Sequence, residues 1–511
     1  MAQVSSACPR RIRVWRYPRC SLPIPGAGST DVWQTTCTLG VLWRRTPLKN
    51  APSNSIGACI RIVASYRKQF SALVCLALFL ASLGRYWVSY DPRDSVPRDP
   101  ETFRLAHNLA ETGQFANPFV PLDTGPSAVV GPAFPAMLAR LISEFGDGSA
   151  GIYAIKLTAV IVLSLQLAFF PLFSRALGMG QSTGFIAAAI WVVGKVGITR
   201  DHRPLSPPLV MFGWEAFYAA ILIAVAVCCC RRYLDLSKDS SCRLAWLIGF
   251  LLGALALISP VAGVIFIGWF VWVAWRNRSV VSSKTYLIVF LLPIIIVTPW
   301  VVRNYLVFHR LILVRDNFGL ELGVSNNDCA TFGNAQNLGS GCFAKVHPNA
   351  NLDEARKVLA DGEPVYNQKK LQEAKYWIRS HPKQFFSLSA LRLAAFWFPP
   401  ATQRTYSLVG PGRKLERVTV YVMTLLSLPG LVMLYRRDKR SAAMCATCLS
   451  LYPLVYYIVQ YDYRYRYPIL WVTFLLGAFP ITALCSKLWR DLTVSSQGKS
   501  GNVRLVGCSS T

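Results

Sequence analysis

Two acidic residues, Asp99 and Glu101, stand on either side of a proline in the segment that follows the first long apolar run. A carboxylate at a membrane surface can act as a general base on an acceptor hydroxyl, or it can hold a divalent cation. The same residues also suit a structural role, in which Asp99 is a helix N-cap and Glu101 favours the positive helix end. From the residues alone the structural role is favoured, and either acid is a candidate base.

A helix has to position these acids. Pro100 suits its first position and Gly113 its stop, while Phe103, Ala106 and Leu109 mark one apolar face. A loop rich in proline and glycine and a second amphipathic helix, over 136–145, follow. We expect this segment to form a wall at the membrane edge, because long ordered loops tend to carry function.

Arginines beside apolar runs form a second candidate group. Arg303 lies at the end of one run, and Arg464 and Arg466 alternate with tyrosines such as Tyr463 before the last run. Arginine binds phosphate oxygens in bidentate pairs, which suits a phosphate clamp. Basic anchors within an interfacial aromatic belt explain the same pattern. Both interpretations stay open on the residues alone.

Glu215 stands at the end of another apolar run and is a further candidate, since an acid at a membrane edge is a functional candidate by default. His202 and Arg203 lie in the same loop and can assist it. The five histidines are scattered along the chain, and this spacing predicts no histidine-based metal site.

Cys329 and Cys342 are the only cysteines of one long polar segment. The interval between them is rich in Ser, Asn and Gly, which suits a loop-closing disulfide if the compartment is oxidising.

Apolar helices must carry these residues. Of the 511 residues 53% are hydrophobic and only 15% are charged, against about 25% charged in soluble domains. The deficit concentrates in runs of about 18–22 residues, enough to cross a roughly 30 Å hydrocarbon layer. This pattern excludes a soluble enzyme, a disordered chain and a collagen, and it disfavours a β-barrel. It predicts an all-α polytopic membrane protein with about 10–11 transmembrane helices.

The topology follows from the basic clusters. Spans are expected at about 70–90, 152–173, 181–198, 212–230, 244–259, 260–275, 285–302, 417–434, 442–459 and 467–487. Segment 386–397 is interpreted as an interfacial helix, with an eleventh span as the alternative. Ten spans put the basic clusters on one side, so the positive-inside rule makes both termini cytoplasmic. Two large segments with juxtamembrane helices, about 91–150 and 303–385, then face outward from the plasma (inner) membrane.

The net charge of +29 is uneven along the chain. Residues 1–69 contain eleven Lys and Arg and one acid, and we expect a basic, disordered cytoplasmic extension there. Residues 70–487 form the expected transmembrane domain, and 488–511 a cytoplasmic tail. Cytoplasmic-side basic residues and anionic membrane lipids explain the charge. No nucleic-acid recognition motif is found, so no nucleic-acid partner is expected.

The order of several motifs resembles the glycosyltransferase C superfamily over about residues 70–485. The first outward segment contributes Asp-Pro-Glu at 99–101, Thr-Gly-Pro-Ser-Ala at 124–128 and Pro-Ala-Phe-Pro at 132–135. The later parts contribute Pro-Trp-Val-Val-Arg-Asn-Tyr at 299–305 and Arg-Tyr-Arg-Tyr-Pro at 464–468. The most similar groups are bacterial glycosyltransferase family 39 and the dolichyl-phosphate-mannose–protein mannosyltransferase-like proteins, with aminoarabinose transferase as a cousin.

This resemblance implies inverting transfer of a sugar from a polyprenyl-phosphate-linked donor to a lipid, glycan or protein acceptor on the extracytoplasmic face. Glu101 matches the family's acid and Asp99 is the second choice, because this chain has Asp-Pro-Glu and Phe103 where many members have Asp-Glu and then Tyr. The residues implied to bind the donor phosphate are Arg303, Arg464, Arg466 and Tyr463. The other implied pocket residues are Glu215, His202, Arg203, Asn304, Asn317 and Glu321. No cofactor is required by the resemblance, and a divalent cation is left open because members differ.

Two other classes of function remain as alternatives. A transporter or flippase needs ionisable residues at mid-membrane, whereas the acids here gather at the outer interface, and no internal repeat typical of transporters is found. A non-catalytic membrane scaffold would keep the fold and leave the acids pointing away from any cavity.

Overall fold

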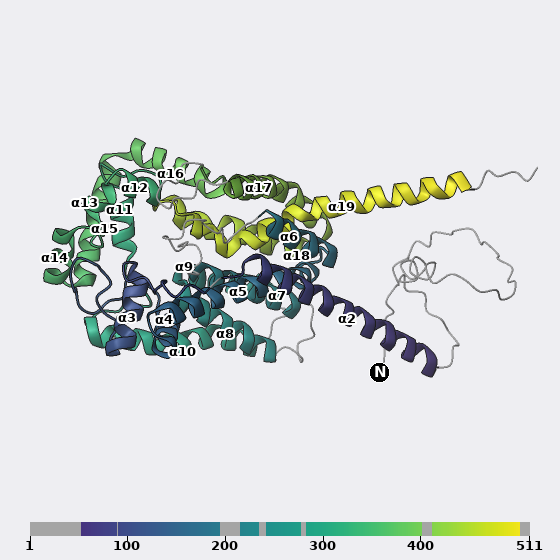
Figure 1. Ribbon diagram of the computed structural model, residues 1–511, viewed down its shortest axis with the longest axis horizontal. Helices are drawn as coiled ribbons and strands as arrows, with labels where there is room; N and C mark the ends of the chain where they lie inside the picture. Colours follow the sequence, from purple (N-terminus) through teal and green to yellow (C-terminus); the bar gives the residue numbers. More distant parts are fainter. Residues whose placement is uncertain are drawn as a thin grey trace, which may run out of the picture. The chain divides into compact units, whose positions relative to one another are not determined.

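The computed structural model describes residues 53–88, 90–194, 215–234, 242–276, 283–400 and 411–500 (Figure 1). These residues form helices and no β-sheet; two isolated bridges join Ala116 to Pro126 and Gly333 to Tyr461. The all-α prediction is therefore confirmed. Most of the predicted extension 1–69, the last part of the tail, and the candidates His202 and Arg203 lie outside the described residues.

The chain divides into two compact units, 1–66 and 67–511, and the second contains the helical bundle. The first helices are α2 (Ser53–Arg85), α3 (Glu101–Thr112), α4 (Ala133–Phe145), α5 (Ser149–Ala176), α6 (Gln181–Val193), α7 (Glu215–Tyr233), α8 (Cys242–Ile258), α9 (Pro260–Arg276) and α10 (Ser283–Phe308). The later helices are α11 (Phe318–Ser325), α12 (Asn334–Gly339), α13 (Cys342–Val346), α14 (Leu352–Asp361), α15 (Glu363–Ser380), α16 (Pro382–Trp397), α17 (Pro411–Arg437), α18 (Lys439–Ser450), η3 (Tyr452–Tyr457), η4 (Tyr463–Arg466) and α19 (Tyr467–Ser500).

Five helical stretches of the described chain are long and apolar enough to cross a membrane. They are Ser149–Ala176, Glu215–Tyr233, Leu287–Phe308, Leu415–Arg437 and Tyr463–Trp489. Four shorter apolar stretches, Gln69–Arg85, Gln181–Val193, Arg243–Ile258 and Pro260–Val273, coincide with four more of the predicted spans. The polytopic α-helical class is confirmed, and the count of ten spans stays a prediction.

The structure bears on two predictions about single helices. The span expected over 442–459 is interrupted: α18 ends at Ser450 and η3, a 3-10 helix, follows. Pro453 in η3 has no N–H and its ring crowds the preceding turn, which disfavours continuation of the α-helix at this position. The segment predicted as an interfacial helix, α16, is a 16-residue helix with the buried Arg392, and it is not among the membrane-crossing stretches.

The long helices pack closely in the bundle. Helix α19 contacts α17, α6 and α7, and α10 contacts α8. At the α17–α19 contact, a Cβ atom on Gly430 would lie 1.9 Å from the carbonyl oxygen of Leu476. Only glycine permits this approach, in the way that small residues permit close packing of membrane helices.

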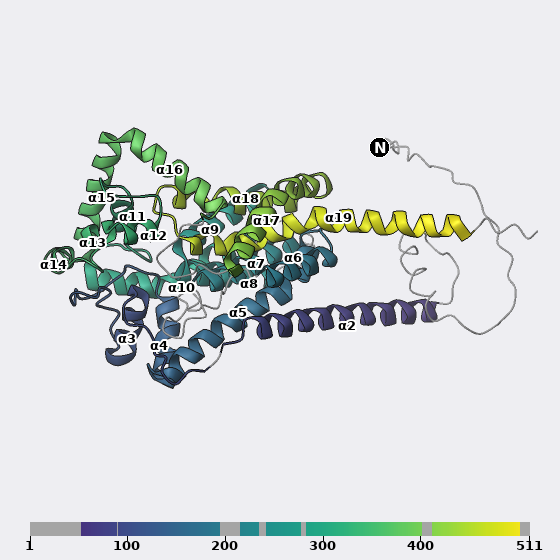
Figure 2. The same cartoon turned by 45° about the horizontal axis from the view of Figure 1, so that its top comes forward.

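The two segments predicted to face outward lie together. Figures 1 and 2 show α11, α13, α14 and α15 near α3 at one end of the bundle. One apolar core contains Leu105, Phe115 and Phe119 from the first segment, and Leu320 and Tyr366 from the second. Burial of these side chains holds the start of α3 against the second segment.

Candidate active site

Helix α3 places Glu101 at its first position. The N-cap is Pro100, which makes no side-chain cap, so the prediction of Asp99 as the N-cap is wrong. Asp99 is exposed, and its carbonyl oxygen accepts a hydrogen bond from the side chain of Asn349 at 3.3 Å. The predicted stop is confirmed: Gly113 has a φ of 73° and donates to the carbonyl oxygen of Leu109.

The Glu101 carboxyl group is mostly removed from solvent, with 22% of its side chain exposed. One of its oxygens lies 3.4 Å from Nε2 of His347. Burial raises the pKa of Glu101 to about 8, the nearby carboxyl group of Glu321 adds to the increase, and the positive charges of Arg464 and Arg315 oppose it. A carboxyl group with a pKa in this range is suited to proton transfer near neutral pH.

A cavity of about 160 Å³ lies where the start of α7, the α8–α9 junction, α11, η3 and η4 meet. This volume exceeds that needed for a few water molecules. Its charged and amide side chains are Glu215, Arg315, Asn317, Glu321 and Arg464. Its aromatic side chains are Phe318, Tyr452, Tyr456 and Tyr465. Four residues that the sequence implied for the pocket therefore line one cavity: Glu215, Asn317, Glu321 and Arg464.

A chain of hydrogen bonds orders one wall of the cavity. Arg315 donates from Nε to the side-chain oxygen of Asn317 at 2.7 Å. Asn317 in turn donates to Glu321 at 3.2 Å, and burial raises the pKa of Glu321. The sequence implied Asn317 and Glu321 but not Arg315, although Arg315 belongs to the same short run of polar residues.

Arg464 reaches the cavity from η4. Its backbone N–H donates to the side chain of Asp462 at 3.1 Å, and Asp462 is the N-cap of η4. The guanidinium group of Arg464 lies over the ring of Tyr465 and 3.7 Å from an oxygen of Asp462. Tyr463 packs edge-on against the ring of Tyr467 and does not line this cavity.

Two predicted phosphate ligands, Arg303 and Arg466, instead bond to protein groups. Arg303 donates to the carbonyl oxygens of Ser127 and Phe115, each at 2.8 Å. Arg466 is buried and donates to the carbonyl oxygen of Trp397 at 2.6 Å. Neither arginine lines the cavity, and both direct their guanidinium groups to carbonyl oxygens of the protein instead.

The neighbouring candidate Asn304 is likewise held by the protein. It is buried, donates to the carbonyl oxygen of Ile312 at 3.1 Å and accepts from Arg303 at 3.0 Å. The motif at 299–305 therefore joins α10 to both outward segments and contributes no cavity wall.

Glu363, which the sequence did not single out, joins the same two segments. Its buried carboxyl group accepts from the hydroxyl of Ser127 and from the backbone N–H of Ala128, each at 2.6 Å. Burial raises the pKa of Glu363 to about 7, although both hydrogen bonds act in the opposite direction. The carbonyl oxygen of Ala128 accepts from the backbone of Asp316 at 2.9 Å. Hydrogen bonds of the loop at 124–128 therefore connect the two segments.

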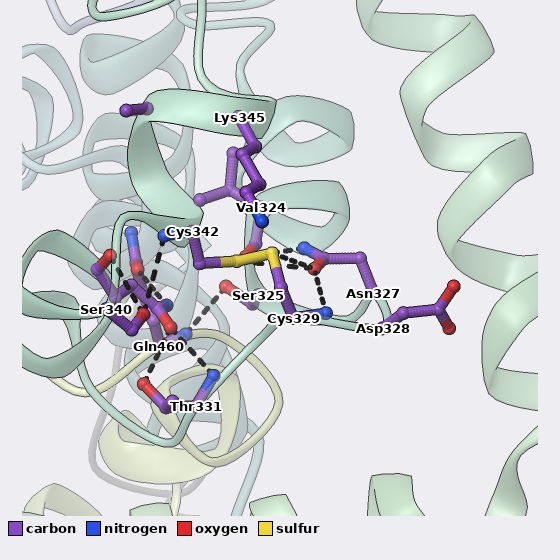
Figure 3. Close-up of a disulfide and its surroundings, with 12 residues drawn as sticks. Val324, Ser325, Asn327, Asp328, Cys329, Thr331, Ser340, Cys342, Lys345 and Gln460 are labelled. Carbon is purple, nitrogen blue, oxygen red and sulfur yellow. Dashed lines mark hydrogen bonds between the residues drawn. A yellow bond between two sulfur atoms is a disulfide. The ribbon is translucent and has the colours of Figure 1, made fainter.

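Cys329 and Cys342 form a disulfide (Figure 3). The side-chain oxygen of Asn327 accepts from the backbone N–H of Cys329 at 3.1 Å. Cys342 is the first residue of α13, so the bond fixes the start of this helix to the chain that follows α11. Within the described residues, no group of three or more His, Cys, Asp or Glu side chains is arranged to hold a metal ion.

No protein-family model matches the chain, and no curated protein matches it. It resembles the oligosaccharyltransferase AglB from Archaeoglobus fulgidus, solved with an inhibitory peptide and a dolichol-phosphate, at 14% identity and a TM-score of 0.48. That match covers 84% of this chain and 52% of the solved chain. An oligosaccharyltransferase structure from the same organism, with zinc and sulfate, matches at 12% identity over 84% and 51%, with a TM-score of 0.47. The chain spans about half the length of these solved proteins.

Proposed function

We propose that the protein is a membrane glycosyltransferase that moves a sugar from a polyprenyl-phosphate-linked donor to an acceptor on the extracytoplasmic face. The observation that carries the proposal is the electrostatic influence of two cavity arginines on the buried carboxyl group of Glu101, which itself is not among the residues that line the cavity. Arg464 and Arg315 line the cavity, and their charges also lower the pKa of Glu101. The proposed base is therefore close enough to the two proposed phosphate-binding side chains to be affected by their charges.

The reaction is a direct displacement. Glu101 accepts the proton of the acceptor hydroxyl or amine while that group forms a bond to the anomeric carbon. The bond between this carbon and the phosphate oxygen breaks, and its electron pair remains on the phosphate. Arg315 and Arg464 stabilise this charge, a contribution that is commonly the largest in catalysis.

The other cavity walls suit a sugar on an apolar carrier. Tyr456 and Tyr465 are stacked with ring centroids 4.5 Å apart, and they offer aromatic surface beside the carboxyl group of Glu215. Sugars present apolar C–H faces and hydroxyl edges, which these two kinds of side chain complement. Glu215 and Pro260 begin two apolar helices, α7 and α9, so the cavity lies at helix ends where a lipid tail can run alongside the bundle.

The test is an assay of membranes that contain the full chain with a polyprenyl-phosphate sugar. Glu101→Gln should lower the transfer rate by about 10²–10⁴-fold, the usual contribution of a general base. Asp99→Asn is the matched control, because Asp99 is exposed, and it should stay within a few-fold of the wild type. Full activity of Glu101→Gln would overturn the assignment of the base.

The arginine assignment is tested in the same assay. Arg315→Met should raise the KM for the donor and lower kcat, since the phosphate is bound in the ground state and gains charge in the transition state. A wild-type chain that moves a solute or lipid-linked sugar across the membrane without forming a glycosidic bond would instead favour the transporter or flippase.

A further inference from the structure

His347 is a buried imidazole between the two outward segments, and its ring is held firmly in place. It follows α13 directly and stacks on Phe343, with ring centroids 4.3 Å apart and an interplanar angle of 14°. Phe119, from the first outward segment, packs edge-on against the same ring. The disulfide at Cys342 fixes the other end of α13. The ring therefore has a defined orientation.

Hydrogen bonding defines which ring nitrogen carries the proton. Nδ1 of His347 accepts from the backbone N–H of Asn349 at 3.0 Å. Burial lowers the pKa of His347 to about 3, so the ring is neutral and its one proton is on Nε2. The side chain of Asn349 accepts from the backbone N–H of Val120 and donates to the carbonyl oxygen of Asp99. These contacts tie the histidine to the chain immediately before α3.

The protonated nitrogen faces the carboxyl group of Glu101. Nε2 lies 3.4 Å from Oε1, longer than the common 2.7–3.2 Å of a hydrogen bond. Such bonds are often long in unliganded sites and tighten when substrate binds.

We infer that His347 is a positioning residue for Glu101: its Nε2–H donates to one carboxylate oxygen and leaves the other to face the acceptor. This inference rests on the proposed function for the role of Glu101 as a base. A neutral histidine that cannot take a second proton is suited to this task, because it orients the base without competing for the acceptor's proton.

The inference predicts a change in the acidity of Glu101. The other charged groups that act on this carboxyl group are Glu321 from α11, Glu363 from α15, Arg464 from η4 and Arg315. A donor to the charged form lowers a carboxyl pKa, so removal of the Nε2–H should raise the pKa of Glu101 by about one unit. His347→Phe and His347→Met remove the donor, and His347→Gln keeps a side-chain N–H.

The experiment measures this acidity without any need for transfer activity. Dicyclohexylcarbodiimide adds to protonated carboxyl groups in apolar surroundings, and the modified peptide is quantified by mass spectrometry, with Glu101→Gln as the blank. In the purified full chain, labelling of Glu101 should fall around pH 8 in the wild type and about one unit higher in His347→Phe. His347→Gln should stay near the wild type. Equal midpoints in the wild type and a folded donor-free variant would overturn the inference.

Folding and function are separated by two further measurements. Thermal unfolding identifies a variant that does not fold, and His347→Met then replaces His347→Phe as the donor-free variant. In the transfer assay, the rising limb of the pH–rate profile should move with the labelling midpoint, and a limb that does not move overturns the inference. Absence of transfer by the wild type with every donor tried defeats the proposed function, while the labelling result still decides whether His347 donates to Glu101.

Discussion

The four arginines near the candidate site fall into two groups according to what each guanidinium group contacts. Arg303 and Arg466 donate hydrogen bonds to backbone carbonyl oxygens. A hydrogen bond from a charged donor contributes about 1.5–3 kcal/mol to stability. Arg315 and Arg464 line a cavity beside carboxyl groups. An arginine whose donors are already bound to carbonyl groups cannot also hold a phosphate without breaking those bonds. The proposed phosphate ligands are therefore Arg315 and Arg464.

Glu363 should make the stability of the protein depend on pH. Its pKa is about 7 in the folded chain and near 4.5 in the unfolded chain, so between these values the folded state retains a proton that the unfolded state has lost. Stability should therefore fall as the pH rises from about 4.5 to 7, by about 2–3 kcal/mol from this residue, and level off above pH 7. Glu363→Gln should lack this component.

Thermal unfolding in detergent between pH 4.5 and 8 measures the effect of Glu363. At each pH, the relevant quantity is the difference in unfolding temperature between the wild type and Glu363→Gln. Glu101, Asp316 and Glu321 also have raised pKa values, and they titrate in both proteins. Parallel curves for the wild type and Glu363→Gln would contradict this account.

Glu101, Asn317 and Glu321 were predicted as site residues from the family resemblance, which rests on short local motifs. Glu363 and His347 acquire their roles from distant partners: Ser127 is 236 residues away from Glu363. No spacing rule can reveal a pairing over that separation, because only the packing of the two outward segments creates it.

At the level of helices, hydropathy located most elements but not their ends. A helix at 100–112 was predicted from its apolar face, and α3 begins one residue later. The span predicted over 442–459 is interrupted after Ser450, where the composition stays apolar but Pro453 disfavours continuation of the α-helix. Helices α8 and α9 have 17 residues each and meet at Ser259 beside the cavity. At a rise of about 1.5 Å per residue, such a helix is slightly shorter than the hydrocarbon layer.

The contact between α11 and α15 should depend on Gly319. A Cβ atom at this position would lie 1.9 Å from the carbonyl oxygen of Asn367 in α15, so Gly319→Ala must push the two helices apart. Helix α11 carries Glu321, so the shift should disturb the cavity as well as the fold. We expect a loss of about 1–3 kcal/mol in unfolding free energy, the usual cost of overpacking, together with reduced transfer.

Gly339→Ala is the matched control for Gly319→Ala. No atom lies within 4 Å of a Cβ atom built at Gly339, and its φ is not positive. This control should unfold close to the wild-type temperature and keep its activity. If the two variants melt at the same temperature, α11 and α15 are not in the close contact described.

At the scale of the whole molecule, α7 connects the cavity to a cluster of basic residues. Helix α7 begins at Glu215 in the cavity and ends at Arg231 and Arg232. Its 19 residues span about 27 Å, close to the thickness of the hydrocarbon layer. Arg231 pairs with Asp438 at 2.9 Å, which brings the basic end of α7 to the basic α17–α18 junction. The positive-inside rule then predicts that this end is cytoplasmic and that the cavity is extracytoplasmic.

This orientation can be measured with single cysteines and a membrane-impermeant maleimide. Lys375 is an exposed residue of α15, in the segment that carries Glu363, and Arg437 is an exposed residue at the end of α17. Tyr421 of α17 donates to the carbonyl oxygen of Pro399, next to α16. Sixteen residues of helix, about 24 Å, separate Tyr421 from Arg437, which places Arg437 toward the opposite face.

In intact cells Lys375→Cys should react with the maleimide, and Arg437→Cys should react only after the membrane is permeabilised. Mapping of the labelled peptides distinguishes the introduced cysteines from the native ones. The reverse pattern would place the cavity on the cytoplasmic side. A donor in the outer leaflet could not then reach Glu101, so the proposed extracytoplasmic transfer fails with it, whereas the hydrogen bonds that join the two outward segments are the same in either orientation.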